Sequence, residues 1–220
     1  VDLGRPDRFW HLIPLIGLFN FPVSMLSWDV VVLNGYLLIN VHICGYLLYM
    51  KYLQRKPHPW LYMPFVFLSI FWAISIHTVT AFLYCGLPGR GYWLTAVLAA
   101  RFLASAFAAG PAFLILVTYI AKIFTGFDPG KGVLPTLGKT VVYAMCVNLF
   151  LLLCEVFTVF YSQIPSHMAH LQYLFVGYHG HGVLVPWMWS SMIMAVVGIL
   201  ILLVPKNRQQ DNMLIIACLL

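Results

Sequence analysis

Charged residues are scarce in this sequence: Asp, Glu, Lys and Arg make up 8% of its 220 residues, whereas 62% are hydrophobic. Soluble globular domains carry about 25% charged residues, so the composition excludes an ordinary soluble domain. The apolar residues gather in runs of about 20, which is the length that a helix needs to cross a hydrocarbon core of about 30 Å. The sequence therefore predicts an all-α fold, a polytopic transmembrane helix bundle.

Five complete spans are predicted, near residues 28–50, 61–84, 93–121, 140–162 and 183–204. A sixth apolar run starts at Met213 and continues to Leu220, where the sequence stops. At the other end, Val1 opens the sequence without the basic region and short apolar segment of a signal peptide. We expect residues 1–220 to form a single integral membrane domain, a fragment of a longer subunit with about eight to ten spans.

Cysteine is also scarce, with five residues, and no two of them form a C-x-x-C pair. They are Cys44, Cys85, Cys146, Cys154 and Cys218. Zinc sites and iron–sulfur clusters need several thiolates that converge, usually from closely spaced pairs. We therefore expect no metal cluster held by this chain alone.

The basic residues are divided unevenly between the two sides of the predicted bundle. The loops after the first, third and fifth spans hold Lys51, Arg55, Lys56, Lys122, Lys131, Lys139, Lys206 and Arg208. The other side holds Arg5, Arg8 and Arg90. The positive-inside rule makes the first side cytoplasmic, and we call the other side the outer face. The net charge of +6 is scattered singly over loops, which argues against a nucleic-acid surface.

The few ionisable residues within the spans lie near their outer ends: Asp29, His77, Arg101 and Glu155. Buried charges at matched depth neutralise one another and hold water or a polar ligand. We expect a polar cavity open to the outer face, with Arg101 as the partner of Glu155. Structural alternatives stay open: Asp29 as a helix N-cap, Arg101–Glu155 as an ion pair of the bundle, and His77 as an interhelical hydrogen-bonding residue.

Two histidine patterns suggest other ligands. His42 and His77 on neighbouring spans invite a haem site, but their depths differ and neither span carries a second spaced histidine. The segment 163–182 holds His167, His170, His179 and His181 without any acidic residue, a pattern more typical of interfacial hydrogen bonding or proton uptake than of a closed metal site.

One glycine-rich stretch resembles a phosphate-binding loop. The segment GKGVLPTLGKT has Val133 where that motif requires Gly. We interpret the likeness as chance, and Asp128-Pro129-Gly130 as a turn on the cytoplasmic side.

Aromatic residues are dense at the outer ends of the spans: Phe9, Trp10, Trp28, Tyr84, Tyr92, Trp93, Phe160, Tyr161, Tyr173, Trp187 and Trp189. Most are expected to anchor the bundle at the interface. Others are suited to wall a pocket for a flat hydrophobic ligand. The polar cluster would then reach the oxygens of the ligand, and a quinone fits both features.

The opening VDLGRPDRFWHL, followed by SMLSWDVVVLNGYLLIN, resembles the NrfD/PsrC family of polysulfide and nitrite reductase membrane subunits, in which a D-L-G-R-P segment precedes a span with a polar start. The stretches SIHTVTAFLYCGLPGRGYW, LCEVFTVFYSQIPSHMAHLQYLFVGYHGHGVLVPWMWSSM and LVPKNRQQDNML look most like its sulfate-reducer branch, the DsrP subunits of DsrMKJOP complexes. The likeness extends over nearly all of the chain.

The resemblance implies a membrane subunit of an anaerobic respiratory, sulfur- or sulfite-linked oxidoreductase complex in the cytoplasmic (inner) membrane of a prokaryote. It implies menaquinol or menaquinone as substrate and no haem or iron–sulfur cluster bound in this chain. Electrons would be exchanged with a ferredoxin-like iron–sulfur subunit docked on the outer face, beside the other subunits and the lipid, with no role for nucleic acid.

The resemblance also implies roles for single residues. His77 and Glu155 match positions at the quinol pocket or proton path of the family, and Asp2 and Arg5 belong to its surface motif. We expect His77, Glu155 and Arg101 to be catalytic. The residues expected to bind the quinone are His77, Asp29, Asn34, Trp28 and Tyr84.

Two alternative functions are kept beside this one. A haem b-bearing, cytochrome-like subunit would show a visible absorption band assignable to this chain. A proton or solute transporter would use membrane carboxylates and arginines along its path, and would favour spans broken at Gly or Pro, of which Gly110-Pro111 is the one candidate seen in the sequence.

Overall fold

The computed structural model describes residues 6–13, 16–17, 19–87, 89–130 and 132–220. The regular elements in these ranges are helices, with one isolated β-bridge between Tyr178 and His181. The chain divides into two compact units, residues 1–87 and 88–220. Each unit is described by itself.

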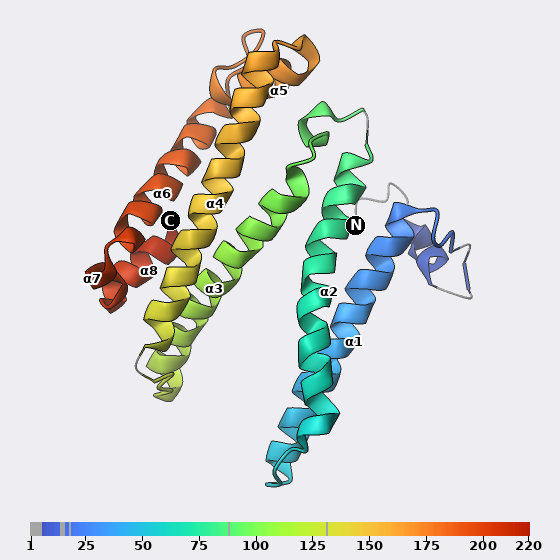
Figure 1. The fold of residues 1–220 in the computed structure, drawn as a ribbon, viewed down its shortest axis with the longest axis vertical. Helices are drawn as coiled ribbons and strands as arrows, with labels where there is room; N and C mark the ends of the chain where they lie inside the picture. Colours follow the sequence, from blue (N-terminus) through green and yellow to red (C-terminus); the bar gives the residue numbers. More distant parts are fainter. Residues whose placement is uncertain (1–5, 14–15, 18, 88, 131) are drawn as a thin grey trace. The chain divides into compact units, whose positions relative to one another are not determined.

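The first unit is built around a helical hairpin. η1 (Pro6–Leu12) precedes α1 (Met25–Tyr52), and α2 (Pro59–Cys85) runs back beside α1 (Figure 1). α2 starts with a proline, which suits the first helical position because its missing N–H would have no intrahelical partner there. At 28 and 27 residues, the two helices are about 40 Å long, enough to cross the hydrocarbon core.

A close approach at Gly35 holds this hairpin together. A Cβ atom added at Gly35 would lie 2.5 Å from the Trp72 ring, and Trp72 Nε1 donates a hydrogen bond of 2.7 Å to the carbonyl of Val32. Farther along, His42 Nε2 lies 2.9 Å from the carbonyl of Leu61. Because a carbonyl can only accept, the imidazole donates there through Nε2.

The second unit contains three long helices, α3 (Leu98–Thr125), α4 (Val133–Ser162) and α6 (Val185–Leu203). α4 packs against both α3 and α6. η2 (Gly91–Trp93) and α5 (Pro165–Phe175) pack together at one end, whereas α7 (Pro205–Arg208) and α8 (Asp211–Leu219) follow the other end of α6 (Figure 1). α8 folds back into contact with α3 and α6.

The core of this unit lies where α3, α4, α6 and α8 meet. Its buried side chains are Ile115, Tyr119, Leu134, Val141, Val142, Ile199, Leu202, Leu214 and Ala217. Two glycines let α8 approach closely: a Cβ at Gly138 would lie 2.8 Å from Leu214 Cδ1, and one at Gly198 would lie 3.4 Å from the carbonyl of Ala217. The small residues therefore position the last helix.

The predicted fold class is confirmed. Five helices, α1, α2, α3, α4 and α6, are long and apolar enough to cross a membrane, and they expose many large hydrophobic side chains on their outer surfaces, Phe71, Phe113 and Phe150 among them. Such surfaces are stable in lipid and not in water. The protein is a multi-pass integral membrane protein.

Several predicted boundaries are wrong by a few residues. The fourth span starts at Val133, not near residue 140, because Gly132 adopts φ 94° and ends the preceding turn there. The third starts at Leu98, not near residue 93, because η2 and a short link that ends in a turn come first. The segment 163–182, interpreted as a loop, contains the helix α5, which starts at Pro165.

Two interpretations of helix geometry are corrected. Ser24 occupies the N-cap position of α1, so Asp29 lies inside the first turns and is not the cap. α3 continues through Gly110 and Pro111 to Thr125, so this segment is not the broken helix centre that a transporter would favour.

Candidate functional site

Arg101 and Glu155 face each other across the α3–α4 contact of the second unit. Arg101 is three residues from the start of α3, about one turn, and Glu155 is seven residues from the end of α4, about two turns. Arg101 Nη1 donates to Glu155 Oε2. The Glu155 side chain is 9% exposed and that of Arg101 22%. The predicted pair is thus present in the structure.

The guanidinium keeps one polar atom unsatisfied. Arg101 Nε is buried and has no hydrogen-bond partner in the described part of the chain. A buried donor without a partner costs about 1–3 kcal/mol, more when it is charged. A water molecule or a ligand oxygen beside Nε would remove this cost, so the pair is chemically suited to hold a polar group.

Two cavities adjoin the ion pair. The cavity on the Glu155 side has a volume of about 230 Å³ and is lined by Gly91, Tyr92, Leu94, Thr95, Val97, Glu155, Thr158, Val159, His167 and Leu171. The cavity on the Arg101 side, of about 200 Å³, is lined by Tyr92, Trp93, Leu98, Arg101, Phe102, Ser105 and Asn148. Tyr92 lines both, so each member of the charged pair borders a cavity of mixed polar and apolar lining, and the two cavities share one tyrosine.

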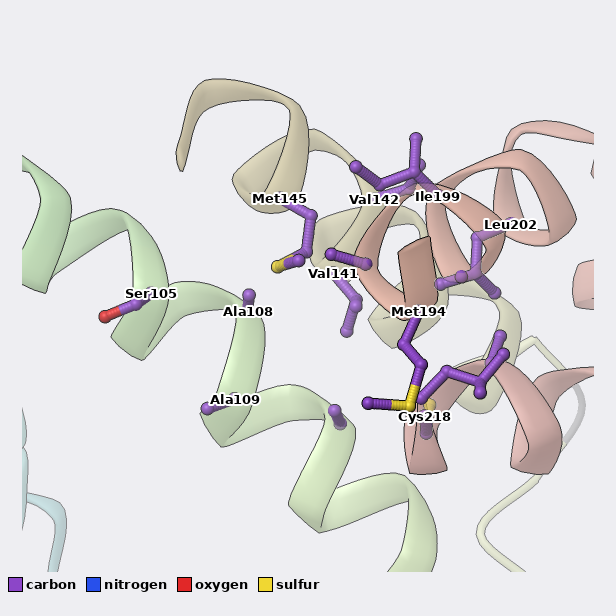
Figure 2. A pocket seen from close by; sticks show the side chains of 15 residues that line it. Ser105, Ala108, Ala109, Val141, Val142, Met145, Met194, Ile199, Leu202 and Cys218 are labelled. Atoms are coloured by element: carbon purple, nitrogen blue, oxygen red, sulfur yellow. The ribbon is translucent and has the colours of Figure 1, made fainter. Parts of the chain in front are cut away.

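A third cavity, of about 260 Å³, lies deeper among α3, α4, α6 and α8. Figure 2 shows Ala108 and Ala109 of α3 on one side and the larger Val141 and Met145 of α4 on another. Ser105 lines this cavity and also the one beside Arg101. An apolar space therefore adjoins the polar one.

The lining residues that were not predicted to lie beside the ion pair include Tyr92, Asn148 and His167. Asn148 precedes Glu155 by seven residues, about two helical turns, which places both on one face of α4. Ser105 follows Arg101 by four residues and shares its face of α3 in the same way. That spacing is a signal in the sequence. Tyr92 and His167 belong to segments outside the spans. No residue spacing in the sequence predicts that these segments pack beside the ion pair.

The other predicted residues lie in the first unit. Asp29 Oδ1 accepts a hydrogen bond of 2.8 Å from Thr80 Oγ1, which joins α1 to α2. Trp28 Nε1 donates to the carbonyl of Pro22. The exposed Asn34 donates through Nδ2 to the carbonyl of Val30 in its own helix. The Asp29 side chain thus contacts a neighbouring helix.

His77 and Tyr84 lie in the last third of α2, the end that is predicted to face outward. His77 Nδ1 is 2.9 Å from the carbonyl of Ala73, so the ring donates there through Nδ1. A neutral ring then presents Nε2 as an acceptor, and no described residue occupies it. The structure does not place these residues relative to Arg101 and Glu155. The motif residues Asp2 and Arg5 lie outside the described residues.

The histidines after the fourth span do not converge. His167 lines the cavity beside Glu155, and His170 packs against Gly91, where an added Cβ would lie 3.0 Å from its Nε2. His179 has φ 50° in the turn closed by Tyr178 and His181. Within the described ranges, no group of three His, Cys, Asp or Glu residues is arranged to hold a metal ion.

Comparison with known proteins identifies relatives among the subunits of reductases. A protein of Halobacterium salinarum, assigned as a membrane subunit of dimethyl sulfoxide reductase, is 26% identical over 77% of this chain and 40% of its own length. A selenate reductase subunit of Mesobacillus selenatarsenatis is 22% identical over 95% of this chain and 54% of its own length. The chain therefore spans about half the length of these relatives.

The family model for polysulphide reductase, NrfD, matches residues 1–220. The predicted resemblance is confirmed at this level, whereas the closer likeness to the DsrP branch stays a prediction. Together with the five apolar helices, the match shows what the chain is: it belongs to the polysulphide reductase NrfD family of multi-pass membrane proteins.

Proposed function

We propose that this chain is part of the quinone-interacting membrane subunit of an anaerobic respiratory oxidoreductase complex. It oxidises menaquinol, or reduces menaquinone, at a pocket in the outer leaflet. The electrons pass to or from an iron–sulfur subunit on the outer face. The chain itself binds no haem or cluster, and the complex is sulfur- or sulfite-linked in a prokaryotic inner membrane.

The observation that carries this proposal is the buried Arg101–Glu155 pair, which borders two cavities of mixed lining, one of which shares Ser105 with a more apolar cavity. A quinone has a polar head with two oxygens and a long apolar tail. The unpartnered Arg101 Nε suits a quinone oxygen, and the cavity lined by Ala108, Ala109 and Met145 suits the tail. The names of the relatives, which are subunits of reductases, support the same class of function.

The chemistry requires separate routes for protons and electrons. Oxidation of menaquinol to menaquinone releases two protons and two electrons. The electrons leave to the iron–sulfur partner, and the protons need acceptors near the quinol oxygens. Glu155 accepts a proton from the quinol and passes it on, and Arg101 balances the carboxylate charge whenever Glu155 is ionised. His167, which lines the cavity with Glu155, provides a next acceptor toward the outer face.

His77 keeps its predicted role within the first unit. Its Nδ1 is engaged by the carbonyl of Ala73, so its Nε2 is the atom that accepts a hydrogen bond or a proton from a quinol. Asp29, Asn34, Trp28 and Tyr84 are proposed to shape the binding surface around it. The proposal for His77 is independent of that for Arg101 and Glu155.

Ala109→Phe tests whether the apolar cavity binds the tail of the quinone while its head group binds beside Arg101. Ala109 lines the apolar cavity but is exposed, so the larger side chain fills the cavity with little strain on the core. We expect the KM for a menaquinol with an isoprenoid tail to rise about tenfold, which corresponds to roughly 1.4 kcal/mol, whereas the KM for tailless menadiol stays nearly unchanged. The measurement is quinol oxidation by the purified complex.

Ala100→Phe is the matched control, because Ala100 is exposed on the same helix and lines none of these three cavities. It should leave both KM values unchanged. Equal effects of Ala109→Phe on the two quinols, or no effect on either, would contradict the placement of the tail. Failure of the complex to oxidise any quinol would contradict the proposed function itself.

A further inference from the structure

The largest of the described cavities, about 490 Å³, lies at the opposite end of the second unit from the ion pair. It is lined by Tyr119, Lys122, Asp128, Pro129, Gly130, Gly132, Leu134, Pro135, Arg208, Gln209, Asp211 and Leu214. Tyr119 is eighteen residues beyond Arg101 on α3, roughly 27 Å away at 1.5 Å per residue. The positive-inside rule places this end at the cytoplasmic interface, at the depth of lipid headgroups.

A buried hydroxyl faces this cavity without a partner. The Tyr119 side chain is 7% exposed, and its hydroxyl oxygen is buried with no hydrogen bond to any described residue. The Asp211 carboxyl is close to it, but no Asp211 oxygen meets the hydroxyl in hydrogen-bond geometry. A buried hydroxyl without a partner costs about 1–3 kcal/mol, so a ligand oxygen here would stabilise the site.

Some of the charged side chains that line the cavity form an ion pair or a hydrogen bond within the described residues, and Arg208 does not. Lys122 Nζ lies 3.2 Å from Asp211 Oδ2, so these two neutralise each other. Arg208 forms no hydrogen bond or ion pair in the part of the chain that the structure describes, and its stem packs on α4, with Cγ 3.8 Å from a Cβ placed at Gly138. Asp128 accepts from the Gly130 amide at 3.0 Å and is otherwise exposed.

The start of α4 adds a partial positive charge. Its N-cap is Gly132, which has no side chain to satisfy the first amide groups, and helix N-termini favour phosphate oxygens. Arg208, the helix start and the Tyr119 hydroxyl are the donors that a phosphate needs. Asp128 opposes a bare anion but suits a ligand that also carries an ammonium group. The lining thus complements a headgroup with both signs of charge.

We propose that this cavity binds the phosphoethanolamine headgroup of a membrane phospholipid. The phosphate accepts hydrogen bonds from Arg208 and Tyr119, and the ammonium group lies toward Asp128. The volume fits a bound headgroup, since ligand cavities commonly measure about 300–1,000 Å³. The site is separate from the proposed quinol pocket and does not depend on quinol turnover.

Native mass spectrometry of the detergent-purified complex tests this site. The complex is mixed with equal amounts of phosphatidylethanolamine and phosphatidylglycerol that carry the same chains. We expect the wild type to prefer phosphatidylethanolamine, and Arg208→Gln to lose that binding at least fivefold. Tyr119→Phe should weaken it several-fold. Asp128→Asn should shift the preference toward phosphatidylglycerol.

Matched controls separate this site from general lipid binding. Lys206→Gln removes an exposed cation from the same short helix, outside the cavity, and Tyr143→Phe removes an exposed hydroxyl from α4; both should bind as the wild type does. Equal binding by Arg208→Gln and the wild type would overturn the proposal. A wild-type preference for phosphatidylglycerol would overturn it in favour of an anionic-lipid site, and displacement of the lipid by millimolar inorganic phosphate would overturn it in favour of a free-phosphate site.

Discussion

At the scale of single residues, the polar side chains in the spans differ in what they contact. Asp29 contacts a hydroxyl on the neighbouring helix, Asn34 contacts a carbonyl of its own helix, and Arg101 and Glu155 contact each other. A side chain whose hydrogen bond stays within its own helix does not hold two helices together. Asp29 and the ion pair, by contrast, join helices, and their loss affects packing as well as chemistry.

Thr80→Val tests the structural role of Asp29, which is its hydrogen bond between α1 and α2. The substitution keeps the shape of the side chain and removes the donor, which leaves the Asp29 carboxylate without its 2.8 Å hydrogen bond. Hydrogen bonds to charged groups contribute about 1.5–3 kcal/mol, so we expect a clear fall in the thermal stability of the assembled complex. Thr78→Val, which removes a bond to the Ile74 carbonyl in the same helix, should have a smaller effect. Equal melting temperatures for the two variants would contradict this role.

Residue roles were only partly predictable from the sequence. The depth of Arg101 and Glu155 in their spans, which follows from the hydropathy pattern, was sufficient to predict their pairing. The N-cap interpretation of Asp29 was wrong, because the boundary of α1 depends on Ser24 and on a preceding segment of weak pattern. Tyr92 was predicted as an interfacial or pocket-lining aromatic residue and His167 as a loop histidine. Their place beside Glu155 was not predicted, because they reach the cavity from η2 and α5, whose packing is tertiary.

At the scale of elements, small residues decide where helices approach. Gly35 in α1 admits the Trp72 indole, and this contact brings Trp72 Nε1 to the Val32 carbonyl. Gly138 and Gly198 have the same function for α8. In lipid, where apolar surface gains nothing by leaving the solvent, such close packing is a main cause of helix association.

Gly35→Ala tests this contact in the α1–α2 hairpin. The new methyl group would lie 2.5 Å from the Trp72 ring, so the indole must move and its hydrogen bond to Val32 weakens. Overpacking of this kind costs about 1–3 kcal/mol. The expected result is a lower thermal stability of the complex, measured by tryptophan fluorescence on heating.

Gly45→Ala is the control for that substitution. It adds the same methyl group to the same helix at a position with no atom within 4 Å. Because a helix is more stable by about 1 kcal/mol with alanine than with glycine at an interior position, this variant should be at least as stable as the wild type. A Gly35→Ala variant that behaves in the same way would show that the indole contact does not hold the hairpin.

The elements themselves were largely predictable. Apolar runs of the right length mark all five spanning helices, because the bilayer sets both their length and their composition. Their ends were less predictable, since they depend on glycines such as Gly132 with φ 94° and on helical turns that extend into the interface. The helix α5 was missed because it has 11 residues, too few to cross the bilayer, so the long apolar runs that mark the spanning helices do not mark it.

At the scale of the whole molecule, the second unit has a charged site near one end of its helices and a differently charged cavity near the other. The end that is predicted to face outward carries Arg101 and Glu155 beside two cavities. The end that is predicted to be cytoplasmic carries Tyr119 and Arg208 around the cavity of about 490 Å³. An apolar cavity lies between these levels, at Ala108 and Ala109. This arrangement fits a subunit that binds a quinone from one leaflet and a lipid from the other.

The Glu155→Gln variant tests the central claim most directly. Glutamine keeps the size and much of the hydrogen bonding of Glu155 but cannot take up a proton. We expect the complex to assemble and its quinol oxidation, normalised to assembled complex, to fall about 100-fold or more, in the range typical of the loss of a general base, with a changed pH profile. In that complex, Arg101 would lose its ionic partner.

The measurement is quinol oxidation across pH by wild-type and Glu155→Gln complexes, each normalised to the amount of assembled complex. A purely structural ion pair predicts a different result: assembly or thermal stability falls first, because an uncompensated buried guanidinium costs several kcal/mol, while each assembled complex turns over as the wild type does. A large loss of normalised turnover with a changed pH profile is the result that we predict. Unchanged normalised turnover with an unchanged pH profile would contradict the proton role of Glu155.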